Sequence, residues 1–474
     1  MPRAATDGAA TAPWRGYLLI AAATAAAYLN SFGGVFQFDD WAVIVEDARV
    51  HSLAAWWASM PGIRPVLKLS YALNWQSGLG LAGFHAFNLI VHVVNGGLVF
   101  TLLRRLAART LVATAGGVGS LAALVAALLF TLLPVQTEAV TYVSGRSASL
   151  AALLALASLL AWDVARDAST PGLRRIGLWI TSVALFLIGL GVKETVLVVP
   201  FALALLALCE ARQRVRWRDA FVATAPHALA LLAAGVAAAS LPRYWLLLES
   251  SFTARDLAVN LLTQLHAVAY LIGQIFMPWR LNADPQLPEV AAWTFATMAL
   301  ALAYATALAA GFASVRSRPA LAFGILWFFL WLAPTNSLLP RLDLVNDRQL
   351  YMALMGPAWL AGCLAARLAS VAATRGRALR STLGVAGIAV LVLASASTAR
   401  RNLVYASEIA FWCDVAQKSP ANPRAAANLG YAYAIAGRPS QAEAEFRRAL
   451  ALDPQYTRAT INLMLLQDGS LGKQ

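Results

Sequence analysis

Long apolar runs separated by short polar loops dominate most of the chain. The first run extends from Gly16 to Gly34, and others of similar length follow as far as about Thr398. A helix needs roughly 20 apolar residues, at about 1.5 Å each, to cross a bilayer. Because backbone groups in hydrocarbon have no water to hydrogen-bond, these runs are expected to be helical. The pattern predicts an all-α, polytopic membrane protein with about eleven spans.

The boundaries of these runs follow from the polar and basic residues between them. The sixth predicted span begins after Glu194 and ends at Arg212. The other ten cover about 16–34, 84–103, 112–133, 147–164, 176–192, 220–241, 290–313, 320–334, 350–369 and 383–398.

Two further stretches have apolar residues but too many polar ones for a simple span. Gln37 to Gly83 is amphipathic and carries several Trp residues, which favour the membrane interface. Leu257 to Met277 is interrupted by Asn, Gln and His residues, which favours an interfacial or re-entrant hairpin. If this second stretch does span the membrane, the orientation of the last third of the chain is inverted.

Arg residues concentrate in alternate loops. The loops after the second, fourth, sixth, eighth and tenth predicted spans each hold between two and four of them. Lys and Arg in short loops stay in the cytoplasm, so the N-terminus is predicted to be cytoplasmic. The formal charge of +14 reflects this distribution and does not indicate nucleic-acid binding. The excess of Arg over Lys is typical of GC-rich bacteria and favours the bacterial inner membrane as the location.

From about residue 406 the chain changes to short amphipathic helices. Seven residues there have the spacing of a tetratricopeptide repeat, a helix–turn–helix unit of about 34 residues: Leu429, Gly430, Tyr433, Ala442, Phe446, Ala449 and Pro454. The sequence therefore predicts a membrane domain, 1–405, and an extracytoplasmic repeat segment, 406–474. Because one repeat cannot bury its own apolar faces, the segment is expected to dock on the membrane domain or on a partner.

Composition agrees with the membrane assignment and narrows the chemistry. The chain is 60% hydrophobic and has a mean hydropathy of +0.64. Cys209, Cys363 and Cys413 have neither disulfide nor zinc spacing. The first apolar run lacks a clear cleavage site and is predicted to be retained. No DxD motif follows it, so we expect no required metal or other cofactor.

Acidic residues next to the predicted spans provide candidate chemistry. Asp39 and Asp40 come directly after the first span, and Glu138, Glu194 and Arg348 fall in loops of the same face. A carboxylate there could take a proton from an acceptor hydroxyl, and fixed cations could stabilise a departing phosphate. In the simpler alternative, one of the paired aspartates only caps a helix that starts at Trp41.

Several motifs together resemble a known family. They are Phe38-Asp39-Asp40-Trp41, Arg64-Pro65, the run from Gly83 to Asn95, Pro134 to Val140, Gly145-Arg146-Ser147, Lys193-Glu194 and Asn346 to Tyr351. This combination is similar to the transmembrane and tetratricopeptide repeat-containing O-mannosyltransferases and their bacterial relatives. The family commonly has His where Leu133 stands and Glu-Arg-Tyr where this chain has Asp347-Arg348-Gln349.

The resemblance implies an inverting glycosyltransferase of the GT-C superfamily. It implies transfer of a sugar, with mannose suggested, from a polyprenyl-phosphate donor to a hydroxyl of an extracytoplasmic protein or glycan. Asp39 or Asp40 would be the catalytic base. The other implied site residues are Arg348, Lys193 and Arg64 for the donor phosphate, and Glu138, Glu194, His85, Arg146 and Tyr351 for the acidic pocket or the acceptor.

Each assignment has a structural alternative. Arg348 could anchor the interface, Lys193 and Glu194 could form an ion pair at a helix end, and His85 with His92 could join a polar contact between helices. For the whole chain, the alternatives are a transporter of lipid-linked sugars and a membrane scaffold whose repeat binds partner proteins.

Overall fold

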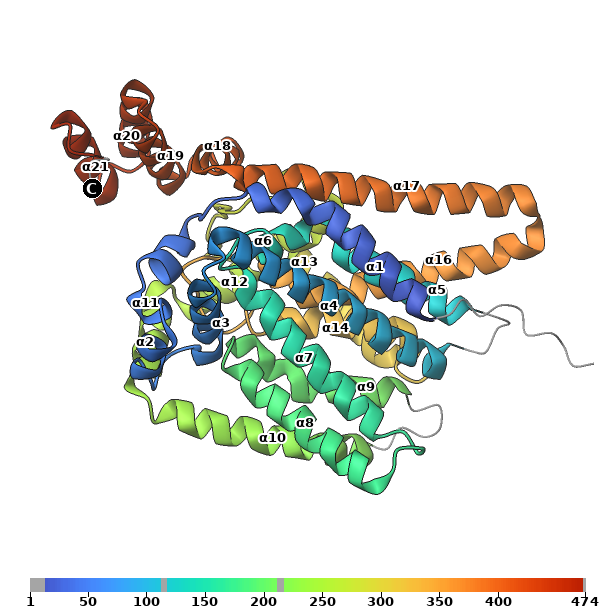
Figure 1. Ribbon diagram of the computed structural model, residues 1–474. Helices are drawn as coiled ribbons and strands as arrows, with labels where there is room; N and C mark the ends of the chain where they lie inside the picture. Colours follow the sequence, from blue (N-terminus) through green and yellow to red (C-terminus); the bar gives the residue numbers. More distant parts are fainter. Residues whose placement is uncertain (1–12, 112–116, 211–216, 472–474) are drawn as a thin grey trace, which may run out of the picture.

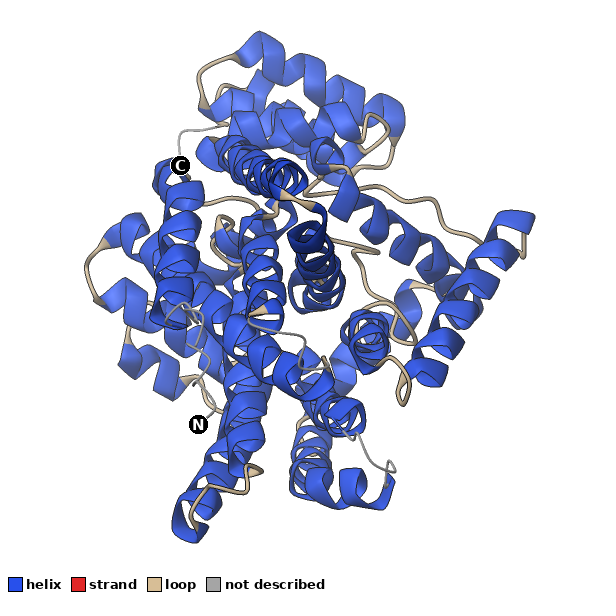
Figure 2. Cartoon of the chain, turned by 90° about the vertical axis from the view of Figure 1, so that its right-hand side faces the viewer, coloured by secondary structure: helices blue, strands red, loops and turns tan. Residues whose placement is uncertain are grey.

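The computed structural model describes residues 13–111, 117–210 and 217–471, and within these ranges every regular element is a helix (Figures 1 and 2). This confirms the predicted all-α class. Val112, the expected start of the third span, and the basic cluster Arg212, Arg214 and Arg216 lie outside the described residues.

The apolar runs form the long helices of the structure. In chain order these are α1 (Pro13–Tyr28), α4 (Gly80–Thr110), α5 (Val118–Leu132), α7 (Arg146–Ala165), α8 (Gly172–Leu190), α9 (Val199–Glu210), α10 (Trp217–Ala239), α13 (Phe295–Ser314), α14 (Pro319–Leu332), α16 (Met355–Arg375) and α17 (Arg377–Asn402). Several of them run side by side across the molecule in Figure 1.

Small residues allow these helices to approach closely. A Cβ atom on Gly96 of α4 would lie 2.6 Å from Thr131 of α5 and 2.8 Å from Ile20 of α1. A Cβ atom on Gly362 of α16 would lie 2.2 Å from the carbonyl oxygen of Ala122 in α5. In membranes, where the apolar surroundings give no hydrophobic drive between helices, such close van der Waals packing is a main source of helix association.

Seven described helices are long and apolar enough to cross a membrane, or up to nine if each of two bent helix pairs is one span. The structure thus shows a multi-pass membrane protein. The count is below the predicted eleven because some apolar runs form shorter helices, such as α1 with 16 residues and α14 with 14. The bent pairs are Val118–Leu132 with Pro134–Val140, and Thr224–Ala239 with Pro242–Ala254.

The stretch predicted to be amphipathic forms two short helices, α2 (Leu53–Ala58) and α3 (Pro65–Gln76). The stretch predicted to be a hairpin is instead one continuous helix, α12 (Leu257–Phe276), so the hairpin prediction was wrong. Asn and Gln in that stretch do not break the helix, because their side-chain amides donate hydrogen bonds to loop carbonyls: Asn260 to Ser337 and Gln264 to Leu344.

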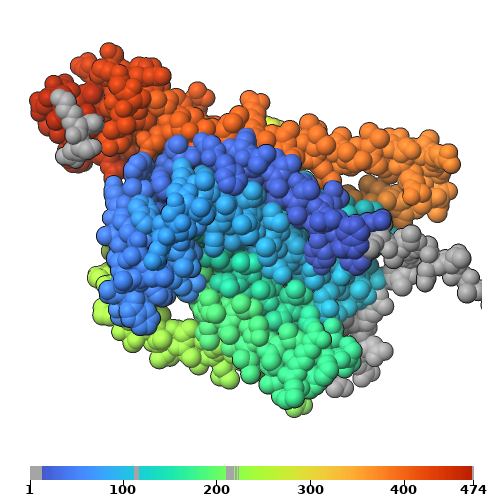
Figure 3. Space-filling view, in the orientation of Figure 1, coloured from blue at the N-terminus to red at the C-terminus, as the bar shows by residue number. Residues whose placement is uncertain are grey.

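After α17 the chain continues into four shorter helices, α18 (Glu408–Lys418), α19 (Pro423–Ile435), α20 (Pro439–Leu452) and α21 (Thr457–Gln467). The side chains of Ser407 and Asn422 cap the first turns of α18 and α19. Gly430 allows α19 and α20 to touch, since a Cβ there would lie 2.7 Å from the Phe446 ring. In Figure 3 these helices project from one end of the molecule.

This C-terminal segment contacts loops of the membrane part. Trp41 donates a hydrogen bond to Glu408 of α18 (2.8 Å), and Asn282 donates one to Ser419 (2.8 Å). Lys418 reaches the carbonyl oxygen of Leu281 at 2.7 Å. The segment therefore docks on the same chain, one of the two outcomes that its short array predicts.

Candidate functional site

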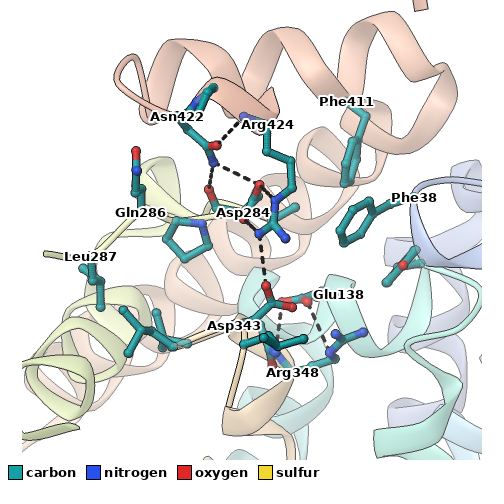
Figure 4. A pocket seen from close by; sticks show the side chains of 18 of the residues that line it. Phe38, Glu138, Asp284, Gln286, Leu287, Asp343, Arg348, Phe411, Asn422 and Arg424 are labelled. Carbon is teal, nitrogen blue, oxygen red and sulfur yellow. Dashed lines mark hydrogen bonds and ion pairs between the residues drawn. The ribbon is translucent and has the colours of Figure 1, made fainter. Parts of the chain in front are cut away.

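A cavity of about 280 Å³ lies where three loops meet the start of α19. Its wall combines aromatic, acidic and basic side chains (Figure 4). The lining residues that carry chemistry are Phe38, Glu138, Tyr142, Asp284, Asp343, Asn346, Arg348, Tyr405, Phe411, Asn422 and Arg424. They come from segments far apart in the sequence, so the cavity depends on the complete fold.

Arg348 lies between two of the predicted carboxylates. Its Nε is 3.5 Å from Oε1 of Glu138, and its Nη2 is 3.8 Å from Oδ2 of Asp39. The backbone N–H of Arg348 also donates a hydrogen bond to Oε2 of Glu138 (3.0 Å). The Arg348 side chain is only 14% exposed, so it is a partly buried member of the wall and not an exposed interfacial anchor.

The adjacent aspartates have different surroundings. Asp40 is fully buried, and its carboxylate accepts hydrogen bonds from the backbone N–H groups of Gln37 (2.9 Å) and Ser144 (2.7 Å). The Asp39 side chain is 41% exposed and faces Arg348. Although a short π-helical turn starts at Trp41, Asp40 makes no side-chain capping hydrogen bond to it. Asp39 is therefore the aspartate that a substrate can reach.

Burial shifts the pKa of both aspartates. It raises the pKa of Asp40 to about 7, against the hydrogen bonds from Gln37 and Ser144. Burial also raises the pKa of Asp39, while the positive charge of Arg348 acts in the opposite direction. A carboxylate whose pKa is raised binds a proton more readily, which suits a general base.

The backbone around Asp39 is held in a sparsely populated conformation. Phe38 has a φ of 44°, in the left-handed region that residues with a Cβ rarely adopt. The N–H of Asp39 donates a hydrogen bond to the Tyr142 hydroxyl (2.9 Å), and the Phe38 ring packs edge-on against Trp412 of α18. These contacts fix the direction in which the Asp39 side chain projects from the backbone.

Three further basic residues, Arg64, Lys193 and Arg341, lie close enough to Arg348 for their charges to influence one another. Arg64 forms an ion pair with Glu194 at 2.7 Å. Lys193 is 8% exposed, and burial lowers its pKa well below the usual range, with further lowering by the charges of Arg348, Arg64 and Arg341. Glu194 thus pairs with Arg64 across 130 residues, which differs from the predicted alternative of a local pair with Lys193.

Three predicted site residues lie within the helix packing. The guanidinium group of Arg146 is fully buried, donates a hydrogen bond to Asn88 (2.6 Å) and lies 4.2 Å from the centre of the Phe87 ring. The hydroxyl of Tyr351 lies 2.7 Å from Nδ1 of His92. The ring of His85 lies 3.4 Å from the carbonyl oxygen of Gly34. These three residues do not line the cavity.

Sequence reasoning missed three residues of this region: Asp284, Arg341 and Arg424. Arg424, in the first turn of α19, contacts Asp284 through two nitrogens and Asp343 at 3.0 Å. Each is a single charged residue in a loop or at a helix start, and no motif marks it. Their charge and their position in loops or at a helix start on the predicted extracytoplasmic face are the only features of the sequence that could have indicated a place in the site.

The arrangement provides three chemical functions in one place. A partly exposed carboxylate (Asp39) can accept a proton, a fixed guanidinium (Arg348) can stabilise developing negative charge, and a cavity beside them can hold a substrate group. The cations beyond Arg348 extend the positive region and would suit an anionic leaving group.

Parts of the chain are similar to animal protein O-mannosyl-transferases. The chain is 31% identical to Protein O-mannosyl-transferase TMTC1 of Homo sapiens over 182 aligned residues. This alignment covers 35% of the chain and 20% of that protein. A 137-residue match, 25% of the chain, is 34% identical to Tmtc2 of Drosophila melanogaster and covers 14% of it. A third match, to human TMTC4, has 28% identity over 201 residues, covering 35% of the chain and 26% of the relative.

These matches show a distant and partial relationship. The chain spans only 14% to 26% of the length of these relatives. No protein-family model matches the chain, and no solved structure matches it. The relationship indicates a glycosyltransferase-like membrane protein, with a sugar donor and an acceptor that it leaves unspecified.

Proposed function

We propose that the chain is an inverting GT-C glycosyltransferase that moves a sugar from a polyprenyl-phosphate donor to a hydroxyl of an extracytoplasmic protein or glycan. The observation that carries the proposal is the position of Arg348, between Asp39 and Glu138 and in the wall of the cavity. The distant relationship to protein O-mannosyl-transferases supports it and suggests mannose as the sugar.

Asp39 is proposed as the catalytic base. Its carboxylate takes the proton of the acceptor hydroxyl as the oxygen attacks the anomeric carbon from the side opposite the phosphate. The bond from that carbon to the phosphate oxygen breaks, and the configuration inverts. The proton then leaves Asp39 for water. Positioned general bases typically contribute about 10²- to 10⁴-fold to the rate.

The cations Arg348, Lys193, Arg64 and Arg341 are proposed to hold the departing phosphate. Their charges influence one another, which supports a shared location. Several like charges close together are unfavourable without a counter-ion, and a phosphate dianion would supply it. Glu138 and Glu194 would keep Arg348 and Arg64 in place between turnovers.

Arg146, His85 and Tyr351 are proposed as positioning residues. Arg146 bridges α4 and α7 through Asn88, and Tyr351 links the segment after Arg348 to α4 through His92. Each would hold a loop of the site without touching the substrate.

The wider architecture of the proposal follows from the sequence. It has a multi-pass membrane domain at 1–405, a tetratricopeptide segment at 406–474, a cytoplasmic N-terminus and a place in a bacterial inner membrane. Neither a metal nor another cofactor is included. The helix pair α19–α20, with Gly430 against Phe446, supports the repeat assignment.

The test is a transfer assay with the purified protein in lipid nanodiscs and a radiolabelled polyprenyl-phosphate hexose. The expected result is a labelled acceptor whose anomeric configuration, measured by NMR, is opposite to that of the donor. Movement of labelled lipid across liposomes with no acceptor modified would favour a transporter and contradict the proposal.

A further inference from the structure

Each charged residue in the cavity wall already has a partner of opposite charge. Glu138 lies 3.5 Å from Nε of Arg348, while Asp284 and Asp343 both contact Arg424 (Figure 4). A charged ligand would have to displace one of these partners and leave a partly buried charge unpaired, which is costly. The wall therefore favours a ligand group with no net charge.

Two buried polar side chains of the wall have no partner. Asn346 is 3% exposed, and neither its amide nitrogen nor its amide oxygen has a hydrogen-bond partner among the described residues. Tyr405 is 1% exposed, and its hydroxyl likewise lacks a partner in that part of the chain. Buried polar groups are normally paired, because an unpaired one loses its hydration without compensation. Because both residues line the cavity, they are the candidates in its wall to pair with a ligand.

Aromatic rings supply the rest of the wall. Phe38 and Phe411 lie on one side, and Tyr142 and Tyr405 stack on each other with their ring centres 6.3 Å apart. Apolar and aromatic walls with a few placed polar groups are typical of small-ligand sites, which usually occupy roughly 300–1,000 Å³. At about 280 Å³ this cavity has the size for one compact group.

We propose that this cavity is an acceptor subsite for a neutral sugar ring, with Asn346 and Tyr405 as the residues that bind its hydroxyls. This inference rests on the proposed function and narrows the acceptor to a glycan. A cavity of about 280 Å³ suits one compact ring, whereas a polypeptide is usually held along a sheet edge or in an extended groove.

The C-terminal segment takes part in this recognition. Phe411 of α18 and Arg424 of α19 lie in the wall, and the Arg424 guanidinium lies 5.5 Å from the centre of the Phe38 ring. Phe38 directly precedes Asp39. The segment thus completes the subsite next to the proposed base, in addition to any partner that it binds elsewhere.

Tyr405→Phe gives the sharpest test, because it removes only the unpaired hydroxyl. Without a sugar, the variant should melt at the same temperature as the wild type or higher, since an unpaired buried group is lost. Methyl hexosides should raise the Tm of the wild type through binding to the folded state, and they should do so less for Tyr405→Phe. Asn346→Leu should show the same loss, and Gln467→Leu on exposed α21 serves as the control.

In the transfer assay both variants should raise the KM for a methyl hexoside acceptor by about tenfold. The KM for the lipid donor and the slow hydrolysis of the donor in water should not change. A rise in the donor KM instead would assign the cavity to the donor sugar and overturn the inference. Equal transfer to Ser and Thr peptides, with no transfer to hexosides, would overturn it as well.

The two proposals fail separately. If hexosides protect the wild type but no acceptor is ever glycosylated, the proposed function is contradicted while the sugar site stands. If transfer occurs and neither variant alters hexoside binding or KM, only the sugar subsite is contradicted.

Discussion

Glu138 contacts both the side chain and the backbone of Arg348. Its Oε1 lies 3.5 Å from Nε of Arg348, and its Oε2 accepts a hydrogen bond from the Arg348 backbone N–H at 3.0 Å. One carboxylate thereby fixes both the position of the loop and the direction of the guanidinium group. Arg348 can then face Asp39 with little freedom, as a preorganised electrostatic site requires.

Asp39→Asn should remove the proposed base without disturbing the fold. The side chain is 41% exposed, so we expect a loss in kcat of about 10²- to 10⁴-fold with little change in Tm. Asp40→Asn is the matched comparison. It replaces a buried carboxylate that accepts two backbone hydrogen bonds, and it should lower Tm more than kcat. Full activity of purified Asp39→Asn would rule out the proposed mechanism.

Arg348→Gln should reduce kcat/KM for the lipid donor by roughly 10²- to 10³-fold, as expected for loss of one preorganised charge. The change also leaves Glu138 without its side-chain partner, so a moderate fall in Tm is expected. Arg447→Gln provides the control, because Arg447 forms an exposed pair on α20. Equal effects of both changes would show that Arg348 has no special role.

The stability of the protein should fall as the pH rises from about 4 to 7. Burial raises the pKa of Asp40 to about 7, above the roughly 3.9 of an unfolded aspartate. In that window the folded state binds more protons than the unfolded state. The contribution of protonated Asp40 to the free energy of unfolding is therefore complete below about pH 4 and is lost above about pH 7. Thermal melts of Asp40→Asn should show a flatter profile. Asp468→Asn, at an exposed site after α21, should keep the wild-type slope.

Gly145→Ala should damage the site through its backbone. A Cβ atom at residue 145 would lie 1.9 Å from the carbonyl oxygen of Glu138, so the turn must move. Overpacking of this kind typically costs about 1–3 kcal/mol, and the displaced Glu138 should reduce transfer as well. Gly177→Ala in α8 is the control, since a Cβ there meets no atom within 4 Å. It should be neutral or slightly stabilising.

The helices were largely predictable because hydrophobic periodicity and run length are local properties. Each apolar run became a helix, and the polar stretch after α1 did not become a long one. The exception was Leu257 to Phe276. Its amides hydrogen-bond to loops about 80 residues away, which stabilises a continuous helix that the local pattern did not favour.

Only part of the site could be predicted from sequence. Asp39, Glu138 and Arg348 belong to motifs, and the structure brings these three together. Arg424 belongs to none, and it meets Asp284 across 140 residues. Arg146 shows the opposite error, because a charged residue at the start of a span was expected in a pocket and is packed against aromatic rings.

The docking of α18 and α19 has a consequence for how the chain can be divided. Tyr405 and Phe411 both line the cavity, on either side of the boundary predicted at 405/406. Division of the chain at that boundary would place residues that line one cavity in two different fragments. The C-terminal helices are therefore not a removable accessory: truncation after α19 would keep every residue of the cavity wall, whereas truncation from residue 406 would remove Phe411, Asn422 and Arg424 from it.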